Sequence, residues 1–138
     1  MQTFLPYPDF AQSARCLDRQ RLGKQRVEAL QIVRTLRHDG GWRNHPAVVM
    51  WRSYENWLID YGLAVCSEWT RRGYADTCAA QLSAEVSPEQ QPPPWWLGLE
   101  EMHRSHRSNL LRKNPEWYAQ FWDEVDSLPY YWPKMTEA

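Results

Sequence analysis

The chain has 138 residues, a length typical of one domain with its own buried core. Its formal net charge is −1, which excludes an acidic or basic excess over the whole chain as the basis of binding. Three widely spaced cysteines without a CxxC or CxxH pattern predict neither a zinc site nor a disulfide framework. Reduced thiols fit a cytoplasmic protein, and we expect no metal and no other cofactor.

The N-terminal residues predict an extended arm rather than a targeting signal. The stretch MQTFLPYP has neither the charged n-region nor the apolar h-region of a signal peptide. No apolar run in the chain is long enough to cross a bilayer, so no membrane partner is expected. We therefore expect residues 1–8 to lie as an arm against the body of the domain.

A single long helix is predicted over residues 9–37, because no proline or glycine pair interrupts this stretch. Asp9 or Ser13 is expected to cap its start, and Gly40 and Gly41 follow its end. The helix is locally basic: between residues 15 and 37 there are seven basic side chains and two acidic ones. This excess favours a surface that binds phosphate.

One face of this helix carries polar residues where a packing face is expected to be apolar. Arg21, Lys24 and Glu28 recur at steps of three and four, beside a separate apolar arc that already supplies the core-facing side. A polar stripe beside the core is where a cleft would run. The alternative is an ordinary surface ion pair between Lys24 and Glu28, which contributes about 0.3 kcal/mol.

The rest of the chain is expected to form, in order, a helix over residues 46–72, a loop over 75–98, a helix over 99–113, a short aromatic helix EWYAQFWDEV, and an irregular packed tail. Pro46 suits the first turn of a helix, and the EQQPPP run cannot be helical. Alternating strand patterns are absent. We therefore predict an all-α fold, a compact helical bundle that forms a single domain over residues 1–138.

Basic, histidine and aromatic residues outside the first helix are further candidate contacts for a DNA backbone. They are Arg43 and His45 at the start of the second helix, Arg72 at its end, His103, Arg104, His106, Arg107, Arg112 and Lys113 on the third helix, and Trp117 and Tyr118 after it. Structural alternatives stay open: His45 caps a helix, Arg72 complements a helix dipole, and the aromatic residues fill a core.

A single carboxylate in a basic groove limits the reactions that the site could catalyse. Metal-dependent nucleases need two or more carboxylates to hold magnesium, and the sequence has no such acidic cluster. Neither a Walker motif nor a dinucleotide glycine motif occurs. One glutamate flanked by lysine and arginine suits attack at a glycosidic carbon, in which an amine or water is the nucleophile.

Four segments resemble the pyrimidine-dimer DNA glycosylase family of the phage endonuclease V type, and in particular its bacterial branch. They are LDRQRLGKQRVEALQ (17–31), GGWRNHPAVVMWR (40–52), EWTRRGY (68–74) and RSHRSNLLRKNPEWYAQFW (104–122). The resemblance implies a compact all-α domain whose first helix carries a catalytic glutamate, here Glu28. It also implies that an N-terminal α-amino group attacks C1′ to form a Schiff base, that β-elimination follows, and that the aromatic C-terminal segment lies beside the DNA.

In this chain the amine belongs to Met1, because methionine is usually retained before a residue as bulky as Gln2. Lys24, one turn before Glu28, is a second candidate amine. We expect Arg21 and Lys24 to hold the phosphate or the sugar, and Arg26 to contact DNA.

We therefore predict a monomeric DNA glycosylase that excises a damaged or modified pyrimidine from double-stranded DNA, with or without an AP-lyase step. Two other classes stay open. One is a nucleic-acid-binding module of the same fold that lacks turnover. The other is a base- or nucleotide-processing enzyme for small substrates, which would need the groove to close into a pocket.

Overall fold

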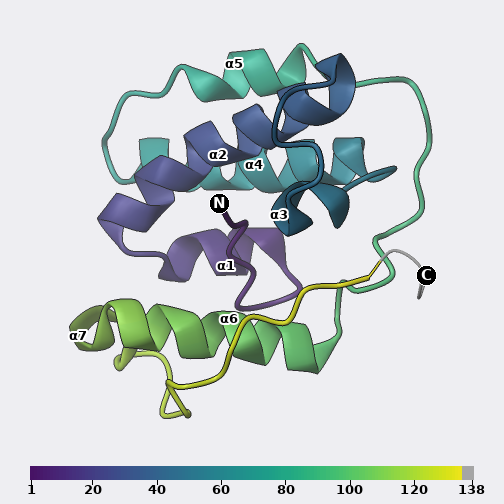
Figure 1. Cartoon of the computed structure of the whole chain (residues 1–138). Helices are drawn as coiled ribbons and strands as arrows, with labels where there is room; N and C mark the ends of the chain where they lie inside the picture. The colour runs from purple at the N-terminus through teal and green to yellow at the C-terminus, as the bar shows by residue number, and fades with distance from the viewer. Residues whose placement is uncertain (135–138) are drawn as a thin grey trace.

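The structure, a computed structural model, describes residues 1–134, and its regular secondary structure over them is entirely helical (Figure 1). The helices are α1 (Phe10–Cys16), α2 (Arg19–His38), α3 (Pro46–Val49), α4 (Glu55–Arg71), α5 (Cys78–Ser83), α6 (Glu100–Lys113) and α7 (Pro115–Tyr118). The all-α prediction is therefore confirmed. Within this part of the chain no helix is long and apolar enough to span a membrane.

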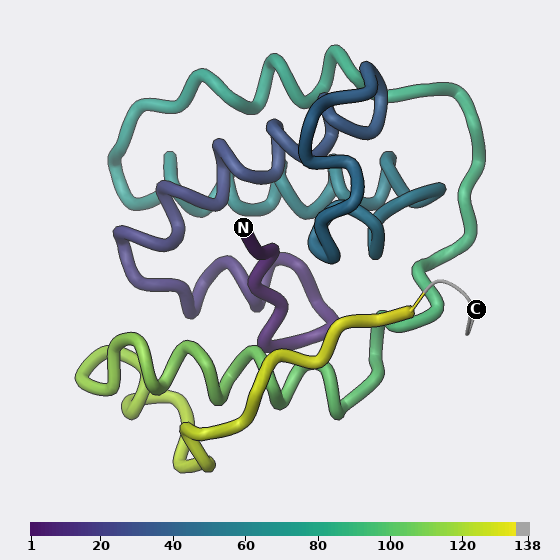
Figure 2. Tube along the Cα trace, in the orientation of Figure 1, coloured from purple at the N-terminus to yellow at the C-terminus, as the bar shows by residue number. Residues whose placement is uncertain are grey.

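Two groups of helices enclose the core. α2 packs along α4, α1 packs against α4, and α5 covers both α2 and α4. α6 and α7 form a second layer, and the N-terminal arm runs in extended form between the two groups, as predicted (Figure 2). Trp51, Tyr61 and Trp96 are fully buried, and the rings of Trp51 and Trp96 meet edge to face with centroids 4.8 Å apart. Part of the aromatic content therefore fills the core.

The prediction of one long helix over residues 9–37 is wrong. This stretch forms two helices, α1 and α2, with Leu17 and Asp18 between them. Leu17 has φ −70° and ψ 138°, an extended conformation that ends a helix. A distant residue holds the break. The backbone N–H of Asp18 donates to the Tyr118 hydroxyl over 3.0 Å, and this hydroxyl donates to Asp18 Oδ1.

The helix ends show which residues act as caps. Asp9 caps α1, because its Oδ1 accepts from the backbone N–H of Gln12 over 2.7 Å. Ser13, the alternative cap, is buried inside α1 and donates to the carbonyl of Tyr7 over 2.9 Å. α2 ends at Asp39, whose φ of 60° is left-handed, just before the glycine pair.

The second predicted helix, residues 46–72, is also two helices, α3 and α4, joined by a turn. Ser53 in this turn has φ 70°, a left-handed conformation that interrupts the helical path. The turn brings Trp51 into the core, where its indole N–H donates to Thr3 Oγ1 of the arm over 3.0 Å. Tertiary packing of one tryptophan thus overrides a continuous helical pattern.

The predicted loop over residues 75–98 contains a short helix, α5, that the sequence prediction missed. α5 buries Cys78 and Leu82. The close approach of α5 to α4 depends on Gly62 of α4, because a Cβ at that position would lie 2.8 Å from Leu82 Cδ1. All three cysteines of the chain are buried and have free thiols.

The C-terminal part agrees with the prediction except for the length of α7. α6 matches the helix predicted over residues 99–113, whereas α7 ends at Tyr118 and is shorter than the predicted aromatic helix. Asn114 caps α7, since its Oδ1 accepts from the backbone N–H of Trp117 over 3.2 Å.

The tail is irregular through residue 134, as predicted, and residues 135–138 lie outside the described part of the chain. It runs along α6 (Figure 2), where the backbone N–H of Tyr131 donates to Ser105 Oγ over 3.1 Å. This path brings Tyr130 to the arm, with its ring centroid 6.4 Å from that of Phe4.

Candidate active site and nucleic-acid interface

A pocket of about 270 Å³ lies where α2, the N-terminal arm, the end of α6 and the tail meet. Its lining residues are Met1, Gln2, Phe4, Gln20, Arg21, Lys24, Gln25, Glu28, Lys113 and Tyr130. The polar stripe predicted on the first helix therefore faces a cavity. The structure also brings the three candidate catalytic residues, Met1, Lys24 and Glu28, into one lining.

Gln25, a buried residue of α2, connects the arm to Glu28. Its amide nitrogen donates to Glu28 Oε2 over 2.9 Å and to the carbonyl of Gln2 over 2.8 Å. Its amide oxygen accepts from the backbone N–H of Phe4 over 2.9 Å. One main-chain donor and one main-chain acceptor thus determine which end of the amide is the nitrogen. Glu28 is held through Oε2, and its Oε1 has no hydrogen-bond partner among residues 1–134.

Tyr61 of α4 supports this arrangement from the core. Its hydroxyl lies 2.5 Å from Gln25 Oε1 and 2.9 Å from the carbonyl oxygen of Phe4, so its single proton is shared between two acceptors. Burial raises the pKa of Tyr61 well above its ordinary value, and the nearby charge of Glu28 adds to the increase. The hydroxyl therefore stays protonated and continues to donate.

The basic residues around Glu28 do not form ion pairs with it in the described structure. The Lys24–Glu28 ion pair of the alternative interpretation does not form in the described structure, and Arg21 instead lies 3.2 Å from Asp18. Neither Lys24 nor Lys113 forms an ion pair with any residue from 1 to 134. Two lysines and the amino terminus thus share one small pocket with a single carboxylate, an arrangement that attracts an anionic substrate.

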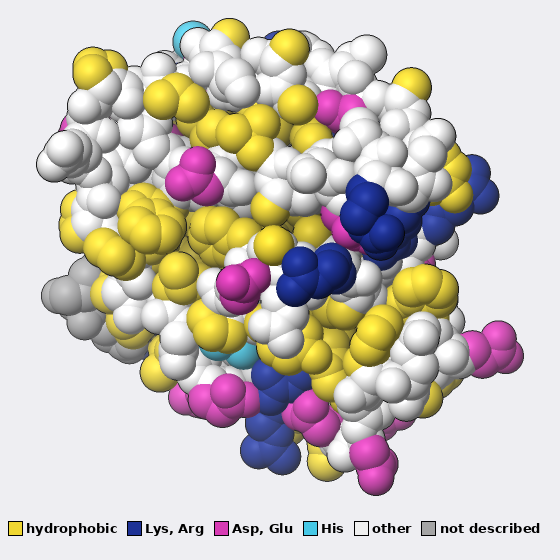
Figure 3. All heavy atoms as spheres, turned by 180° about the vertical axis from the view of Figure 1, so that it is seen from behind, with side chains coloured by type: hydrophobic (Ala, Val, Ile, Leu, Met, Phe, Trp, Pro, Cys, Tyr) yellow, Lys and Arg dark blue, Asp and Glu magenta, His cyan; other side chains and the backbone are white. Residues whose placement is uncertain are grey.

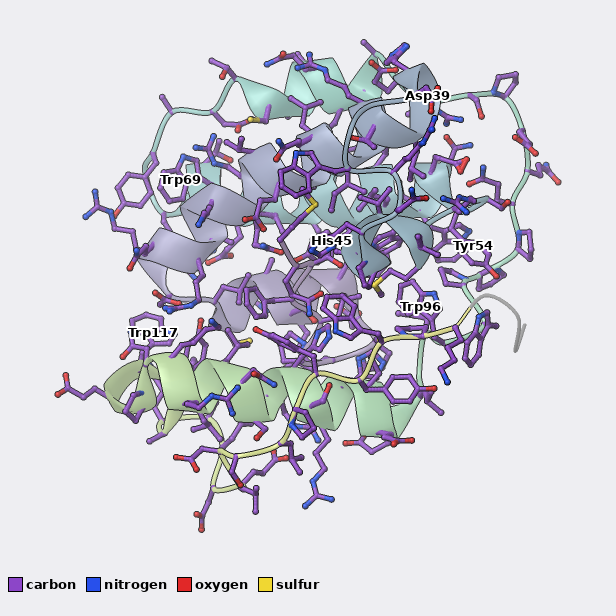
Figure 4. The ribbon with its side chains drawn as sticks, viewed as in Figure 1. Asp39, His45, Tyr54, Trp69, Trp96 and Trp117 are labelled. Carbon is purple, nitrogen blue, oxygen red and sulfur yellow. The ribbon has the colours of Figure 1, made fainter. Side chains whose placement is uncertain are left out.

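His45 lies close enough to the amino terminus to respond to its charge. Burial first, and then the positive charge of the Met1 amino group, lower the pKa of His45. Its Nδ1 accepts from the backbone N–H of Ala47 over 3.0 Å, so His45 also caps α3. Figure 4 shows His45 at the centre of the view, and its ring meets Trp132 edge to face with centroids 6.0 Å apart.

Five of the arginines predicted to contact DNA form ion pairs, and in three of these pairs the guanidinium is largely buried. In each of these three, a guanidinium nitrogen faces a carboxylate oxygen: Arg26 and Asp76 at 2.5 Å, Arg72 and Glu68 at 2.7 Å, and Arg107 and Glu124 at 2.8 Å. Arg107 also donates to the carbonyl of Pro6 over 2.9 Å and so holds the arm on α6. Figure 3 shows basic side chains gathered at the right of the view, at the edge where α4 ends.

Other candidates lie on the surface. Arg104 is exposed and has no ion-pair partner in the described part of the chain. Arg43 is exposed and lies 2.7 Å from Asp39, and Arg112 is exposed but donates to the carbonyl of Asp126 over 2.9 Å. Among these three, Arg104 has the guanidinium with the fewest competing contacts.

His103, His106 and Tyr118 are interior residues, which corrects their assignment as DNA contacts. His103 is 1% exposed, and His106 and Tyr118 are 0% exposed. The Nδ1 atoms of His103 and His106 bond to the arm, and the hydroxyl of Tyr118 bonds to Asp18. Trp117 is half-buried, and its indole N–H donates to the carbonyl at the end of α1 over 2.7 Å.

Gln25, Tyr61 and Tyr130 belong to the site but were not predicted. The sequence contained a signal for Gln25, because a residue three positions before Glu28 on a helix lies beside Glu28. The sequence contained no such signal for Tyr61, which contacts Gln25 from α4, or for Tyr130, which lines the pocket from the tail.

The fold and the site define a small all-α protein with a pocket whose lining combines the carboxylate of Glu28 with Met1 and two lysines. Residues 1–82 match the family model described as pyrimidine dimer DNA glycosylase. This match includes the arm, all of α2 and most of α5, and it covers more than half of the chain, so the chain belongs to the pyrimidine dimer DNA glycosylase family. It is therefore a DNA glycosylase whose substrate is DNA, as the resemblance predicted. Comparison with curated proteins and with solved structures gave no match.

Proposed function

We propose that the chain excises a damaged or modified pyrimidine from duplex DNA by attack at C1′, with Glu28 as the catalytic carboxylate and the α-amino group of Met1 as the nucleophile. The observation that supports this is the shared pocket, which Met1 and Glu28 line together. Its volume of about 270 Å³ lies near the lower end of ligand pockets, which suits one nucleotide drawn out of a duplex.

The first step replaces one bond at C1′ by another. Attack of the neutral amine nitrogen forms a C–N bond while the bond between C1′ and the base breaks, and the base leaves with a proton. The free Oε1 of Glu28 stabilises positive charge on the sugar and accepts the proton that the attacking amine loses. Gln25 acts as a positioning residue, because it holds Oε2 of Glu28 and the carbonyl of Gln2 at once.

The second step would cleave the strand. Opening of the sugar ring converts the adduct into a Schiff base between C1′ and the amine nitrogen. Loss of a proton from C2′ then expels the phosphate from C3′, which is the AP-lyase reaction. Water attack in place of the amine would end the reaction at base release.

Positive charge around the pocket would hold the DNA backbone. Arg21, Lys24 and Lys113 line the pocket, and we assign them to the phosphates nearest the reacting sugar. Further proposed contacts are exposed or half-buried residues at a greater distance along the chain: Arg43, His45, Arg104, Arg112 and Trp117. Arg26, Arg72 and Arg107 are assigned a supporting role, because their guanidinium groups are largely buried in ion pairs.

A substrate panel tests the proposal. Duplexes that carry a pyrimidine dimer, an abasic site or a modified pyrimidine are incubated with the wild-type chain and with Glu28→Gln, and base release is measured. We expect the wild type to release a base from at least one duplex, and Glu28→Gln to release none while it retains DNA affinity. Release by Glu28→Gln at the wild-type rate would overturn the role of Glu28. Binding without release from any duplex would favour the binding module.

A further inference from the structure

Four side chains form a stacked column between α2 and the end of α4. The guanidinium of Arg26 lies 4.5 Å from the centroid of the Trp69 ring, and that of Arg19 lies 5.3 Å from the centroid of the Tyr74 ring. The rings of Trp69 and Tyr74 are 4.3 Å apart, which joins the two pairs. We call these four residues the basic–aromatic column. Figure 4 shows Trp69 beside the first half of α2.

The spacing of residues on α2 builds this column. Arg19, Gly23 and Arg26 stand at i, i+4 and i+7, so they share one face of the helix. Trp69 lies over Gly23, where a Cβ would be only 2.9 Å from its ring. The inner end is fixed as well, because Arg26 lies 2.5 Å from Asp76.

The column offers charge to a ligand rather than ring surface. Arg26 and Tyr74 both lie against the Trp69 ring, and Gly23 lies under its six-membered ring. Much of the indole is therefore already covered, so we infer that the column binds a ligand by charge rather than by base stacking.

Arg19 ends the column at the surface. It is exposed, and no carboxylate within residues 1–134 pairs with it. Stacking on Tyr74 restricts the guanidinium while its N–H groups stay available for an anion. A guanidinium that is already oriented loses less conformational entropy when it binds a phosphate.

A groove of about 470 Å³ runs beside the column and next to the catalytic pocket. It is lined by Arg19, Gln20, Gly23, Lys24, Arg26 and Trp69. Gln20 and Lys24 line the catalytic pocket too, so the two cavities share a wall. α2 rises about 1.5 Å per residue, so Arg19 lies about 13 Å from Glu28 along the helix, or about four nucleotide steps of one DNA strand.

From this geometry we propose that the groove binds the phosphodiester backbone on one side of the reacting nucleotide, with Arg19 as a phosphate ligand. This inference rests on the proposed function, because the Glu28 pocket defines where the reacting nucleotide lies. Arg19 then contacts one flank of the duplex only, since the groove lies on one side of the pocket, toward the start of α2.

Binding to duplexes that do not react tests the groove independently of catalysis. The duplexes carry a stable abasic-site analogue, with both flanks long or with one flank shortened to about two base pairs. With both flanks long, Arg19→Ala should weaken binding and should reduce the slope of log affinity against log salt by about one. Only one flank carries the phosphate that Arg19 contacts. The loss of affinity in Arg19→Ala should therefore vanish when that flank is shortened and persist when the opposite flank is shortened.

Two further variants serve as controls. Arg34→Ala removes an exposed arginine of the same helix that donates to Gln81 of α5 over 2.6 Å, and it should leave affinity and salt slope unchanged. Arg19→Lys keeps the charge without the stacked planar group, so it should keep the salt slope and still bind more weakly than the wild type.

Each outcome decides for or against the groove. The assignment is overturned if Arg19→Ala loses the same affinity whichever flank is shortened. It is also overturned if Arg19→Ala loses no more affinity than Arg34→Ala. A flank-dependent loss supports the groove even if the wild type processes no duplex, in which case the proposed chemistry alone fails. Processing of a duplex without the Arg19 effect leaves the chemistry and removes the groove.

Discussion

The backbone N–H of Leu5 donates to Nδ1 of His106 over 2.9 Å, across 101 positions of sequence. The carbonyl of the same residue accepts from Nδ1 of His103 over 2.8 Å. Two histidines of α6 thus hold both backbone groups of one residue in the arm. Because Leu5 is only four residues from Met1, this contact limits where the amino terminus can lie.

Acid should release this contact. Burial lowers the pKa of His106 to about 3, and burial also lowers the pKa of His103. A histidine whose pKa is lower in the folded than in the unfolded protein contributes its full stabilisation of the fold above about pH 6.5, the unfolded pKa. Below that pH its contribution to the free energy of unfolding falls by up to about 1.4 kcal/mol per pH unit. We expect the free energy of unfolding, measured by urea denaturation, to fall steeply from about pH 6.5 to about pH 5.

Variants of single histidines check the cause. His106→Gln keeps a hydrogen-bond acceptor near Leu5 and cannot be protonated in this range, so its free energy of unfolding should fall less steeply than that of the wild type. His38 is exposed and lies 3.1 Å from Glu85, and His38→Gln should retain the wild-type slope. Equal slopes in the wild type and His106→Gln would contradict the role of His106.

The polar face of α2 that lines the pocket was predictable because helical periodicity depends only on local spacing. Arg21, Lys24 and Glu28 line the pocket as their spacing indicated. The break before α2 was not predictable, since Tyr118 sets it from 100 positions away. No local signal in the sequence identifies that hydrogen bond.

Spacing also fails to distinguish a buried polar face from an exposed one. His103 and His106 stand among arginines, a pattern typical of a phosphate-binding surface. In the structure this face of α6 packs on irregular segments, the arm and the tail, whose backbone groups need hydrogen-bond partners. Polar residues such as Ser105 and Ser108 are buried there for the same reason.

Tyr118→Phe should destabilise the fold at the junction of α1 and α2. The substitution removes a hydroxyl that both accepts from Asp18 N–H and donates to the Asp18 carboxylate, and it leaves buried groups without partners. We expect a loss of about 1–3 kcal/mol in the free energy of unfolding, measured by chemical denaturation. Tyr54→Phe is the control, because Tyr54 is 8% exposed and its hydroxyl bonds to no residue in the described range. Similar losses in both variants would contradict the assignment.

Gln25→Ala should slow base release more than it weakens binding. Without the amide, Glu28 and the arm lose their common support, and a displacement of about 1 Å can cost about a hundredfold in rate. Single-turnover base release should fall by about that factor, while affinity for an abasic-site analogue changes little. Gln31, exposed and three residues after Glu28, provides the control Gln31→Ala, which should release base at the wild-type rate. Equal losses in rate and affinity for Gln25→Ala would indicate a general loss of structure instead.

Two residues that carry a candidate amine line the pocket, Met1 with its α-amino group and Lys24 with Nζ. As a class, α-amino groups lose their proton near pH 8, about two pH units below lysine side chains, so a larger fraction is neutral and nucleophilic at neutral pH. The hydrogen bond from Gln25 to the carbonyl of Gln2 holds the start of the arm beside Glu28, so we expect the α-amine to be the one that reacts next to this carboxylate.

Borohydride reduction during reaction with an abasic duplex should therefore trap a covalent adduct at residue 1, located by mass spectrometry of peptides. An extension at the N-terminus converts the amine into an amide and should abolish the adduct. Lys24→Arg keeps the positive charge but removes that amine, and its adduct at Met1 should persist. An adduct at Lys24 would contradict the assignment to Met1. Base release without any adduct would identify water as the nucleophile, because only an amine leaves a reducible Schiff base on the protein.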